Sequence, residues 1–576
     1  MLYFAMILLH TLGALAAAAG VAPALAADVA AKPVKQVAVI GAGAAGASTA
    51  YHLHKYAEEA GIAVNITIFE KNGRVGGRTL TVNAHENPGS PVELGASIFV
   101  KVNHILWNAT DDFNLVRIDP GLDEKGVMGV WDGDTFVYTQ DSESWGWWNL
   151  AKLVWKYGTA PYYVNDLVQQ TIGAFLKLYE APYFPFRSLT TRAFELGLVK
   201  VTGVTGRQLL AASKLDGSFA HDIVQAASRV NYMSNLDYIH GLGAMVSMAA
   251  EGAKSVLGGN WWIFASMVKA SKAHLNLNTT VVSIAREDIH GDNGEAIYKY
   301  IIKTSGPSSA TAGAAGTVMQ QPVAFDDVVI ATPWQFSDIE EEGTVIEHPI
   351  EPVPYAKLHV TLFSSPFQFS ARFFNLDPAS PVPNSVLTTL ADGDEAKPGA
   401  TGAGKAGFFS ATQVKKVVNP MSGKEEYVYK IFSPEAVTSD FLSSLLGVNV
   451  PDTFVLTQPY ARKTVKTIND KDADFNIVNP ISWYHPAVFH PYPQKLPRVT
   501  FQDPILGRGL YYTSGMESFI STMETSALMG KNVARLIVDD YLGVSGAKEG
   551  LAMSGLEHDG EQIILGGKQP VTSDEL

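Results

Sequence analysis

Short apolar runs and helical segments alternate at the start of the chain. Val37 to Ile40 is an apolar run that ends at a glycine, and a helix is predicted from about Ala45 to Ala60. A second apolar run, Val64 to Phe69, follows this helix. Strand, helix and strand in this order predict a βαβ unit whose helix packs on one face of a sheet.

The middle of the chain, from about Gly121 to Ala249, has a helical and aromatic pattern. Apolar residues recur there at helical spacing from Val164 to Leu176. Such a stripe is typical of a core, and the alternatives are an apolar substrate channel or a patch that makes peripheral contact with a membrane. The aromatic residues that crowd this region are Trp145, Trp147, Trp148, Trp155, Tyr162 and Tyr163.

Later apolar runs predict further strands. Asn276 to Ile284 and Phe325 to Pro333 are expected to return the chain to the first sheet. The region from 346 to 500 is predicted to be rich in strands. Towards the end, Gly509 to Glu517 predicts a strand that stops at glycine, followed by a helix from about Ser521 to Leu542. The N-terminus of that helix could hold negative charge.

Composition limits the class of protein. At 576 residues the chain is too long for one compact core, so two or three domains are expected. Hydrophobic residues at 47% and charged residues at 17% fit a folded globular protein. The net charge of −14 argues against nucleic-acid binding, which needs clustered cations. No cluster of metal ligands stands out, and no metal is expected.

The two ends of the chain resemble targeting signals, although chance similarity is an alternative for the C-terminal one. Residues 1–27 contain no Lys, Arg, Asp or Glu and end in small residues that suit signal peptidase, so a cleaved secretory signal is expected. An uncleaved membrane anchor is the alternative. Ser573 to Leu576 resembles a retrieval signal of the endoplasmic reticulum, with Ser in place of the usual Lys or His. The protein is expected in the secretory pathway, where it is secreted, vacuolar or lysosomal, or retained in the endoplasmic reticulum. Asn108 is the best candidate for N-glycosylation.

Three glycines after the first strand are spaced to hold a dinucleotide pyrophosphate. Gly41 allows a tight turn, Gly43 lets the backbone approach the phosphates, and Gly46 lets the helix pack on the sheet. The N-terminus of that helix then faces the pyrophosphate, where its free N–H groups favour negative charge. Glu70, at the end of the second strand, is suited to accept a hydrogen bond from a ribose hydroxyl.

A second glycine turn follows Glu70 and favours FAD over NAD. Gly76 and Gly77 give another close backbone approach, and the flanking Arg74 and Arg78 can pair bidentately with phosphate. We expect FAD to be non-covalent, because the chain has no cysteine and no histidine lies in these motifs. The predicted cofactor contacts are Gly41, Gly43, Ala44, Ala45, Gly46, Glu70, Lys71, Gly76, Gly77, Arg78, Gly95, Ala96, Ser97, Val281, Gly515, Met516 and Glu517.

The sequence offers candidates for a substrate cleft but no catalytic residue. No Ser–His–acid triad stands out. Trp483 and Tyr484 suit an apolar ligand, and His485 or His490 could meet a carboxylate. Structural packing is an equal alternative for all four residues.

Several of these segments resemble the FAD-dependent amine oxidase superfamily, and more closely its prenylcysteine oxidase (prenylcysteine lyase) family. The motifs that carry the resemblance are Val39 to Gly43, Val75 to Arg78, Glu93 to Ser97, Leu510 to Glu517, and Ser521 to Glu524 with Asn532. The early motifs are shared by many flavoproteins, whereas the run from Leu510 to Glu517 is far more specific to this family.

The resemblance implies an α/β fold in which an α+β substrate domain is inserted into a discontinuous Rossmann-type FAD-binding domain. The FAD-binding parts are expected at 34–120, 250–345 and 501–545. The helical aromatic-rich substrate region is expected at 121–249, the strand-containing substrate domain at 346–500, and a C-terminal tail at 546–576.

The resemblance also implies a reaction: oxidative cleavage of the thioether of farnesyl- or geranylgeranyl-cysteine by oxygen, giving cysteine, a prenyl aldehyde and hydrogen peroxide. Hydride leaves the carbon beside sulfur, water adds to the resulting cation, and the hemithioacetal collapses. Sulfur and the allylic double bond stabilise that cation, so a strong base is not required. Another flavin amine or thioether oxidase is one alternative, and a non-catalytic flavoprotein is a second. The sequence does not indicate an oligomeric state.

Overall fold

The computed structural model describes residues 34–121, 126–141, 146–290, 296–307, 317–453 and 479–544. The predicted signal segment, the C-terminal tail and Trp145 lie outside these ranges. Within them, no helix combines the length and the apolar character that crossing a bilayer requires.

A six-stranded sheet contains the predicted βαβ unit. β1 (Lys35–Ile40) pairs in parallel with β2 (Val64–Phe69) on one side and with β14 (Asp327–Ile330) on the other. Val39 lies opposite Val329 in this register, and both are fully buried. Because the sheet draws strands from three distant parts of the chain, the predicted discontinuous Rossmann-type fold is confirmed. The remaining strands are β9 (His274–Asn276), β21 (Ile505–Gly507) and β22 (Leu510–Tyr512).

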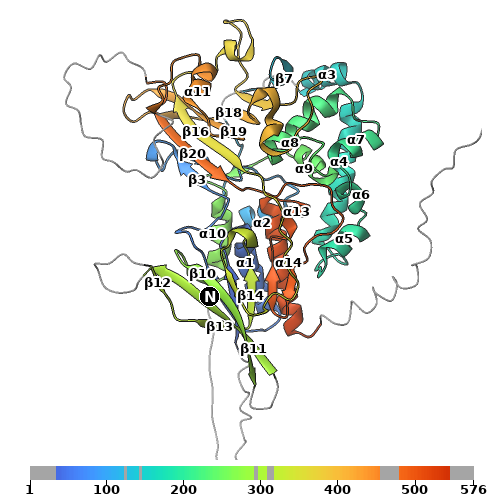
Figure 1. The fold of residues 1–576 in the computed structure, drawn as a ribbon, viewed down its shortest axis with the longest axis vertical. Helices are drawn as coiled ribbons and strands as arrows, with labels where there is room; N and C mark the ends of the chain where they lie inside the picture. The colour runs from blue at the N-terminus through green and yellow to red at the C-terminus, as the bar shows by residue number, and fades with distance from the viewer. Residues whose placement is uncertain are drawn as a thin grey trace, which may run out of the picture. The chain divides into compact units, whose positions relative to one another are not determined.

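Helix α14 (Met523–Tyr541), near the C-terminal end, packs against α1 (Ala44–Glu59), near the N-terminal end (Figure 1). Their contact depends on small residues. A Cβ atom at Gly530 would lie 2.2 Å from the carbonyl oxygen of Ala45, and the Ser48 hydroxyl donates a 2.6 Å hydrogen bond to a backbone carbonyl of α14. This close contact joins the two ends of the discontinuous domain. Two further helices, α2 (His104–Asp112) and α10 (Trp261–Ala270), contact this pair.

The expectation that Asn276 to Ile284 forms one strand of the first sheet is wrong. Asn278 has a φ of +53°, a conformation that Asn adopts more readily than most residues, and the chain turns there. β9 therefore ends within the first sheet, and β10 (Thr280–His290) begins a separate five-stranded sheet beside β11 (Ala296–Pro307). The other strands of this sheet are β12 (Thr317–Met319), β13 (Val323–Phe325) and β15 (Glu340–Glu342).

The helical pattern predicted from Gly121 onward begins later than expected. β6 (Val127–Trp131) and β7 (Phe136–Asp141) form a hairpin, in which the Asp132 carboxylate accepts hydrogen bonds of 2.7 Å from the N–H groups of Asp134 and Thr135. This hairpin joins a seven-stranded sheet through parallel pairing of β6 with β17. The other strands are β16 (Leu358–Ser365), β17 (Ser385–Thr388), β18 (Ser410–Val418), β19 (Glu425–Ser433) and β20 (Trp483–Phe489).

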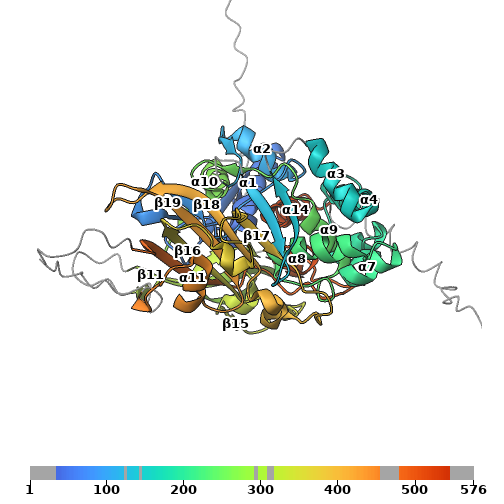
Figure 2. The same cartoon turned by 90° about the horizontal axis from the view of Figure 1, so that it is seen from above.

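A group of helices lies beside this sheet (Figure 2). The predicted apolar stripe is core at Val164 and Val168, whose exposures are 0% and 3%. Trp155, Tyr162 and Tyr163 are instead exposed, by 82%, 72% and 53%. The helices are α3 (Gly146–Tyr157), α4 (Ala160–Leu176), α5 (Leu189–Glu195), α6 (Val199–Thr202), α7 (Gly206–Ala212), α8 (Gln225–Tyr232) and α9 (Gly241–Met248).

Short elements complete the described part of the chain. They are the strands β3 (Thr81–Asn83), β4 (Pro91–Glu93), β5 (Arg117–Ile118) and β8 (Ser255–Val256), and the helices α11 (Ser439–Leu446) and α13 (Met516–Phe519).

We expect Gly46→Ala to destabilise the protein strongly. A Cβ atom at Gly46 would lie 1.9 Å from the carbonyl oxygen of Gly41 and 3.2 Å from Cγ1 of Val39, so α1 would have to move away from β1. Overpacking of this kind costs about 1–3 kcal/mol or more. Urea unfolding of the variant and the wild type measures the loss.

The matched control is Gly173→Ala, in the interior of α4, where a Cβ atom meets nothing within 4 Å. This variant should be more stable than the wild type by about 0.5–1 kcal/mol. Wild-type stability of Gly46→Ala would contradict the tight contact between α1 and its turn.

Candidate functional site

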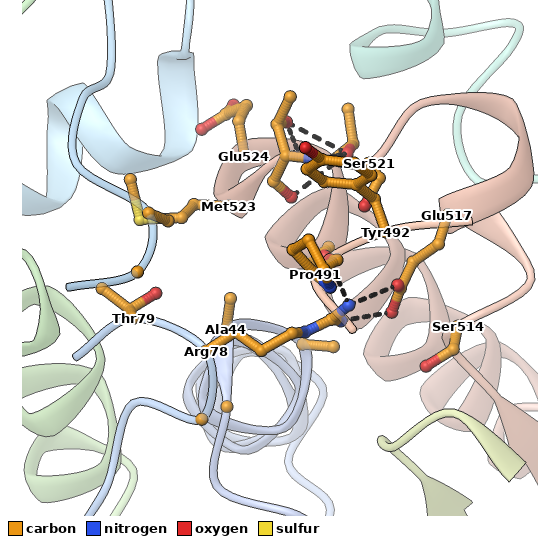
Figure 3. Close-up of a pocket in the computed structure, with 18 of the residues that line it drawn as sticks. Ala44, Arg78, Thr79, Pro491, Tyr492, Ser514, Glu517, Ser521, Met523 and Glu524 are labelled. Carbon is orange, nitrogen blue, oxygen red and sulfur yellow. Dashed lines mark hydrogen bonds and ion pairs between the residues drawn. The ribbon is translucent and has the colours of Figure 1, made fainter. Parts of the chain in front are cut away.

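A cavity of about 810 Å³ lies where the first sheet, the seven-stranded sheet and the helices meet. Glycine turns of the Rossmann-type unit form its floor. Strands β16, β19 and β20 contribute one wall, and α2, α4, α8 and α9 contribute another. Figure 3 shows one end of the cavity, where Arg78, Pro491, Tyr492 and Glu517 lie close together.

The two predicted glycine turns touch each other at the N-terminus of α1. The N–H of Gly76 donates a 2.9 Å hydrogen bond to the carbonyl of Ala42. A Cβ atom at Gly77 would lie 3.1 Å from the Cα of Gly43. Gly41, with a φ of +106°, makes the sharp turn out of β1. Bare backbone and a helix N-terminus therefore face the cavity together, as a bound pyrophosphate requires.

Arg74 provides an independent test of whether an anion fits this floor. Its Nη2 donates a 2.9 Å hydrogen bond to the carbonyl of Gly77, but its Nη1 is buried and has no partner among the described residues. Burial lowers the pKa of Arg74, and the charge of Glu70 partly offsets that effect. A buried guanidinium N–H without an acceptor is costly, and phosphate is a preferred acceptor for it. Arg74 does not line the cavity, however, so the fit of the floor to the pyrophosphate of FAD rests on the two glycine turns and the N-terminus of α1.

Arg78, by contrast, pairs with protein rather than with a free anion site. Its Nη1 and Nη2 donate hydrogen bonds of 2.7 and 2.5 Å to the two carboxylate oxygens of Glu517, and Nη1 also donates to the carbonyl of Pro491 at 2.7 Å. Burial alone would lower the pKa of Arg78, but Glu517 raises it above the usual range. The expectation that Arg78 pairs bidentately with phosphate is wrong, because the buried carboxylate of Glu517 already accepts hydrogen bonds from both of its Nη atoms.

Glu70 stabilises the backbone turns that form the floor of the cavity. It is 5% exposed, and its carboxylate accepts hydrogen bonds from the N–H of Ala42 at 2.9 Å and from the N–H and side-chain amide of Asn72 at 2.8 and 2.7 Å. A carboxylate has about four lone-pair positions, so these three bonds leave capacity for a hydroxyl in the cavity. Contact between Glu70 and the adenosine ribose stays a prediction.

The structure brings most of the predicted cofactor residues to the cavity, although their contact with FAD stays a prediction. Gly46 lies behind the floor, Gly515 packs against Gln502, and Met516 is fully buried in the core. The predicted residues that line the cavity are Gly41, Gly43, Ala44, Ala45, Glu70, Lys71, Gly76, Gly77, Arg78, Gly95, Ala96, Ser97, Val281 and Glu517.

Of the four substrate-cleft candidates, His490 lines the cavity and the other three do not. Trp483, Tyr484 and His485 lie on β20, at the edge of the seven-stranded sheet, where Trp483 and His485 stack with ring centroids 6.1 Å apart. The chain reaches the cavity only where β20 ends. Phe489 and Tyr492, beside His490, are cavity residues that the prediction did not include.

Tyr492 and Tyr232 form an aromatic pair at the inner end of the cavity. Their ring centroids are 5.3 Å apart with an interplanar angle of 76°. The ammonium of Lys495 lies 4.7 Å from the centroid of the Tyr232 ring and donates a 2.8 Å hydrogen bond to the backbone carbonyl of Glu517. Burial lowers the pKa of Lys495 to about 7. The sequence separates Tyr232 from Tyr492 so widely that no local pattern could have paired them.

The helix predicted from about Ser521 to Leu542 is confirmed as α14, and a short helix that was not predicted precedes it. α13 comes first, and α14 begins at Met523, where the Thr522 hydroxyl accepts a 3.1 Å hydrogen bond from the N–H of Thr525. Glu524, in the first turn of α14, is 1% exposed and accepts hydrogen bonds of 2.9 and 3.0 Å from two N–H groups at the start of α2. Burial raises the pKa of Glu524 to about 7. Two helix N-termini, those of α2 and α14, thus meet at the cavity.

Lys430 supports the cavity from the seven-stranded sheet. Its ammonium donates hydrogen bonds of 2.8 Å to the carbonyl of Glu93 and 2.9 Å to the hydroxyl of Ser97. Burial lowers the pKa of Lys430 and raises that of the Glu93 carboxyl. Lys430 therefore links the segment from Gly95 to Ser97, which holds three of the predicted cofactor contacts, to the seven-stranded sheet.

Comparison with known families assigns the chain. A family model described as prenylcysteine lyase matches residues 140–547, and one described as an NAD(P)-binding Rossmann-like domain matches residues 39–113. The chain belongs to the prenylcysteine lyase family. This confirms the predicted resemblance and the prediction of an FAD-dependent oxidoreductase. Among the described residues, no group of three or more His, Asp or Glu side chains could hold a metal ion.

Relatives of the family match nearly the full length of the chain. Farnesylcysteine lyase of Arabidopsis thaliana is 26% identical over 90% of each chain. Prenylcysteine oxidase 1 of Bos taurus is 28% identical over 89% of this chain and 90% of the relative. In fold, a fatty acid isomerase from P. acnes is similar with a TM-score of 0.50, at 12% identity over 87% of this chain and 98% of that one.

Glu70→Ala should weaken FAD binding about tenfold or more. A hydrogen bond to a carboxylate contributes roughly 1.5–3 kcal/mol, and the substitution also releases the N–H groups of Ala42 and Asn72. Titration of apoprotein with FAD, followed by flavin fluorescence, measures the change. Glu59→Ala, at an exposed position of α1, is the matched control and should bind FAD as the wild type does. Unchanged affinity of Glu70→Ala would reject the ribose assignment.

Proposed function

We propose that the protein oxidises the thioether of prenylated cysteine, with FAD bound in the cavity and oxygen as the electron acceptor. The observation that carries the proposal is a cavity that joins a floor suited to a pyrophosphate to two apolar walls in a chain of the prenylcysteine lyase family. The names of the relatives, farnesylcysteine lyase and prenylcysteine oxidase 1, support the substrate class.

The residues that would hold FAD lie on the floor of the cavity. The turn from Gly41 to Ala45, with Gly76 and Gly77 beside it, would take the pyrophosphate, and Glu70 the ribose. The turn from Gly95 to Ser97 and the N-terminus of α14 would flank the ring system. The chemistry that FAD supplies when bound is acceptance of a hydride from the carbon beside sulfur and its delivery to oxygen.

The overall reaction balances without a protein nucleophile. Thioether, oxygen and one water give a prenyl aldehyde, the free thiol of cysteine and hydrogen peroxide. Sulfur and the allylic double bond stabilise the developing cation, so the protein has to bind and orient the substrate rather than remove a proton from carbon. The aromatic pair of Tyr232 and Tyr492 suits that role, because it offers aromatic surface to an apolar, unsaturated chain.

The head group of cysteine meets polar groups at one end of the strand wall. His490 lines the cavity there and stacks on Phe336 with ring centroids 5.1 Å apart. Arg78 lies beside it, bonded to the carbonyl of Pro491. A carboxylate at this end would gain a hydrogen bond from the His490 ring, whereas the charge of Arg78 is already paired with Glu517.

Farnesylcysteine should be oxidised with release of hydrogen peroxide, and short saturated S-alkyl cysteines should react poorly. The farnesyl chain contributes about 0.8 kcal/mol for each buried methylene, and its double bond stabilises the cation. Peroxide release measured for farnesylcysteine, S-propylcysteine, benzylamine and a polyamine compares the candidates. Equal or faster turnover of either amine would favour an amine oxidase.

We expect FAD to be bound without a covalent link. Acid precipitation of the purified protein should leave the yellow colour in the supernatant, since the chain has no cysteine to form a thioether with the flavin. Colour that stays in the pellet would contradict this expectation and implicate a histidyl bond, for which His490 lines the cavity. His490→Gln would then release the colour.

A further inference from the structure

The two apolar walls of the cavity differ in character. The strand wall, which includes Val360 and Phe432, leads to His490 and Arg78. Among the described residues, α4, α8 and α9 form no such polar end, and Glu524, which lines the cavity near the start of α2, is already bonded to two N–H groups there. The residues that α4, α8 and α9 contribute to the lining carry no charge, and Ile172, Phe175 and Val246 are typical of them.

The polar side chains of the helical wall are occupied by protein partners. The amide of Asn231 donates hydrogen bonds of 3.0 and 3.2 Å to the carbonyls of Ala227 and Ser247. The hydroxyl of Ser247 donates a 2.9 Å hydrogen bond to the carbonyl of Gly243. Because these donors point into the protein, the wall offers mainly carbon to a ligand.

The helical wall runs from solvent to the interior. At its outer end Ala250 is exposed, and Ile98 and Val102, which also line the cavity, are 36% and 38% exposed. At its inner end Leu106 is fully buried and Phe175 is 6% exposed. This gradient of exposure defines an apolar path from the surface residues to the buried ones.

We infer that the prenyl chain lies along the helical wall, with the cysteine head group at His490, and that Ala249 and Ala250 limit the chain length. This inference rests on the proposed function. An isoprenoid chain is apolar along its length, so it gains most from the wall that presents carbon throughout. A charged head group gains most from the wall that ends at His490, whose ring can hydrogen-bond a carboxylate. The thioether is thereby placed between the two walls, at the inner end of the cavity.

Binding to the FAD-loaded protein tests this orientation without requiring turnover. Under anaerobic conditions, the flavin absorbance is titrated with dimethylallyl-, farnesyl- and geranylgeranyl-cysteine. For the wild type, affinity should increase at least tenfold from the dimethylallyl to the farnesyl compound. Ala250→Trp fills the outer end of the path, so it should weaken geranylgeranylcysteine at least tenfold, farnesylcysteine less, and dimethylallylcysteine not at all.

Ala212→Trp is the matched control, because Ala212 is an exposed alanine of the neighbouring helix α7 and does not line the cavity. It should leave all three affinities unchanged. Ala249→Leu, a smaller change at the adjacent lining position, should give the same order of effects as Ala250→Trp and serves if the tryptophan variant does not retain FAD. His490→Gln should weaken all three ligands by the same factor, since it acts on the head group.

Affinity that does not depend on chain length, or an Ala250→Trp variant that matches Ala212→Trp, would overturn the inference. So would a loss in His490→Gln that grows with chain length. Failure of the proposed function is recognised separately: wild-type protein that ranks the ligands as expected, yet releases no peroxide from any of them in air, supports the orientation and rejects the oxidase.

Discussion

The contact of helix α1 with bare backbone on two sides is the constraint on which the rest of the structure depends. On one side Gly46 lies against the carbonyl of Gly41, and on the other the carbonyl of Ala45 lies against Gly530 of α14. No side chain fits at either glycine. Because α14 belongs to the C-terminal end of the chain, this packing closes the discontinuous domain and brings the N-termini of α1 and α14 to one cavity.

Buried charges connect the FAD-binding unit to the rest of the protein. The carboxylate of Glu517 accepts hydrogen bonds from both Nη atoms of Arg78, and its backbone carbonyl accepts one from Lys495. Lys430, on the seven-stranded sheet, donates to Glu93 and Ser97. Groups of this kind cost much free energy to desolvate, and each is retained with hydrogen-bond partners around it. Because these groups surround the cavity, their hydrogen bonds also fix the geometry of its floor and its inner end.

The floor and the walls of the cavity suit different parts of the ligands. Glycine turns and a helix N-terminus make the floor suitable for a pyrophosphate, whereas the two walls offer apolar surface to a substrate. The inner end is aromatic, with Tyr232 buried and Tyr492 half-buried. In the proposed reaction the substrate itself stabilises the cation, so the protein has only to bind the cofactor and to orient the substrate.

The sequence by itself determined the βαβ unit, the glycine turns and the family, because each depends on short-range features such as strand period and the backbone freedom of glycine. Only the tertiary structure decided which side chains meet in the cavity. Arg78 pairs with Glu517, which is 439 residues away in the sequence. The hairpin of β6 and β7 joins a sheet whose other strands come from the second half of the chain. Trp483 to His485 lie at the edge of that sheet, outside the cavity. Such partnerships arise from the packing of whole elements, and local periodicity does not encode which distant partner an element will meet.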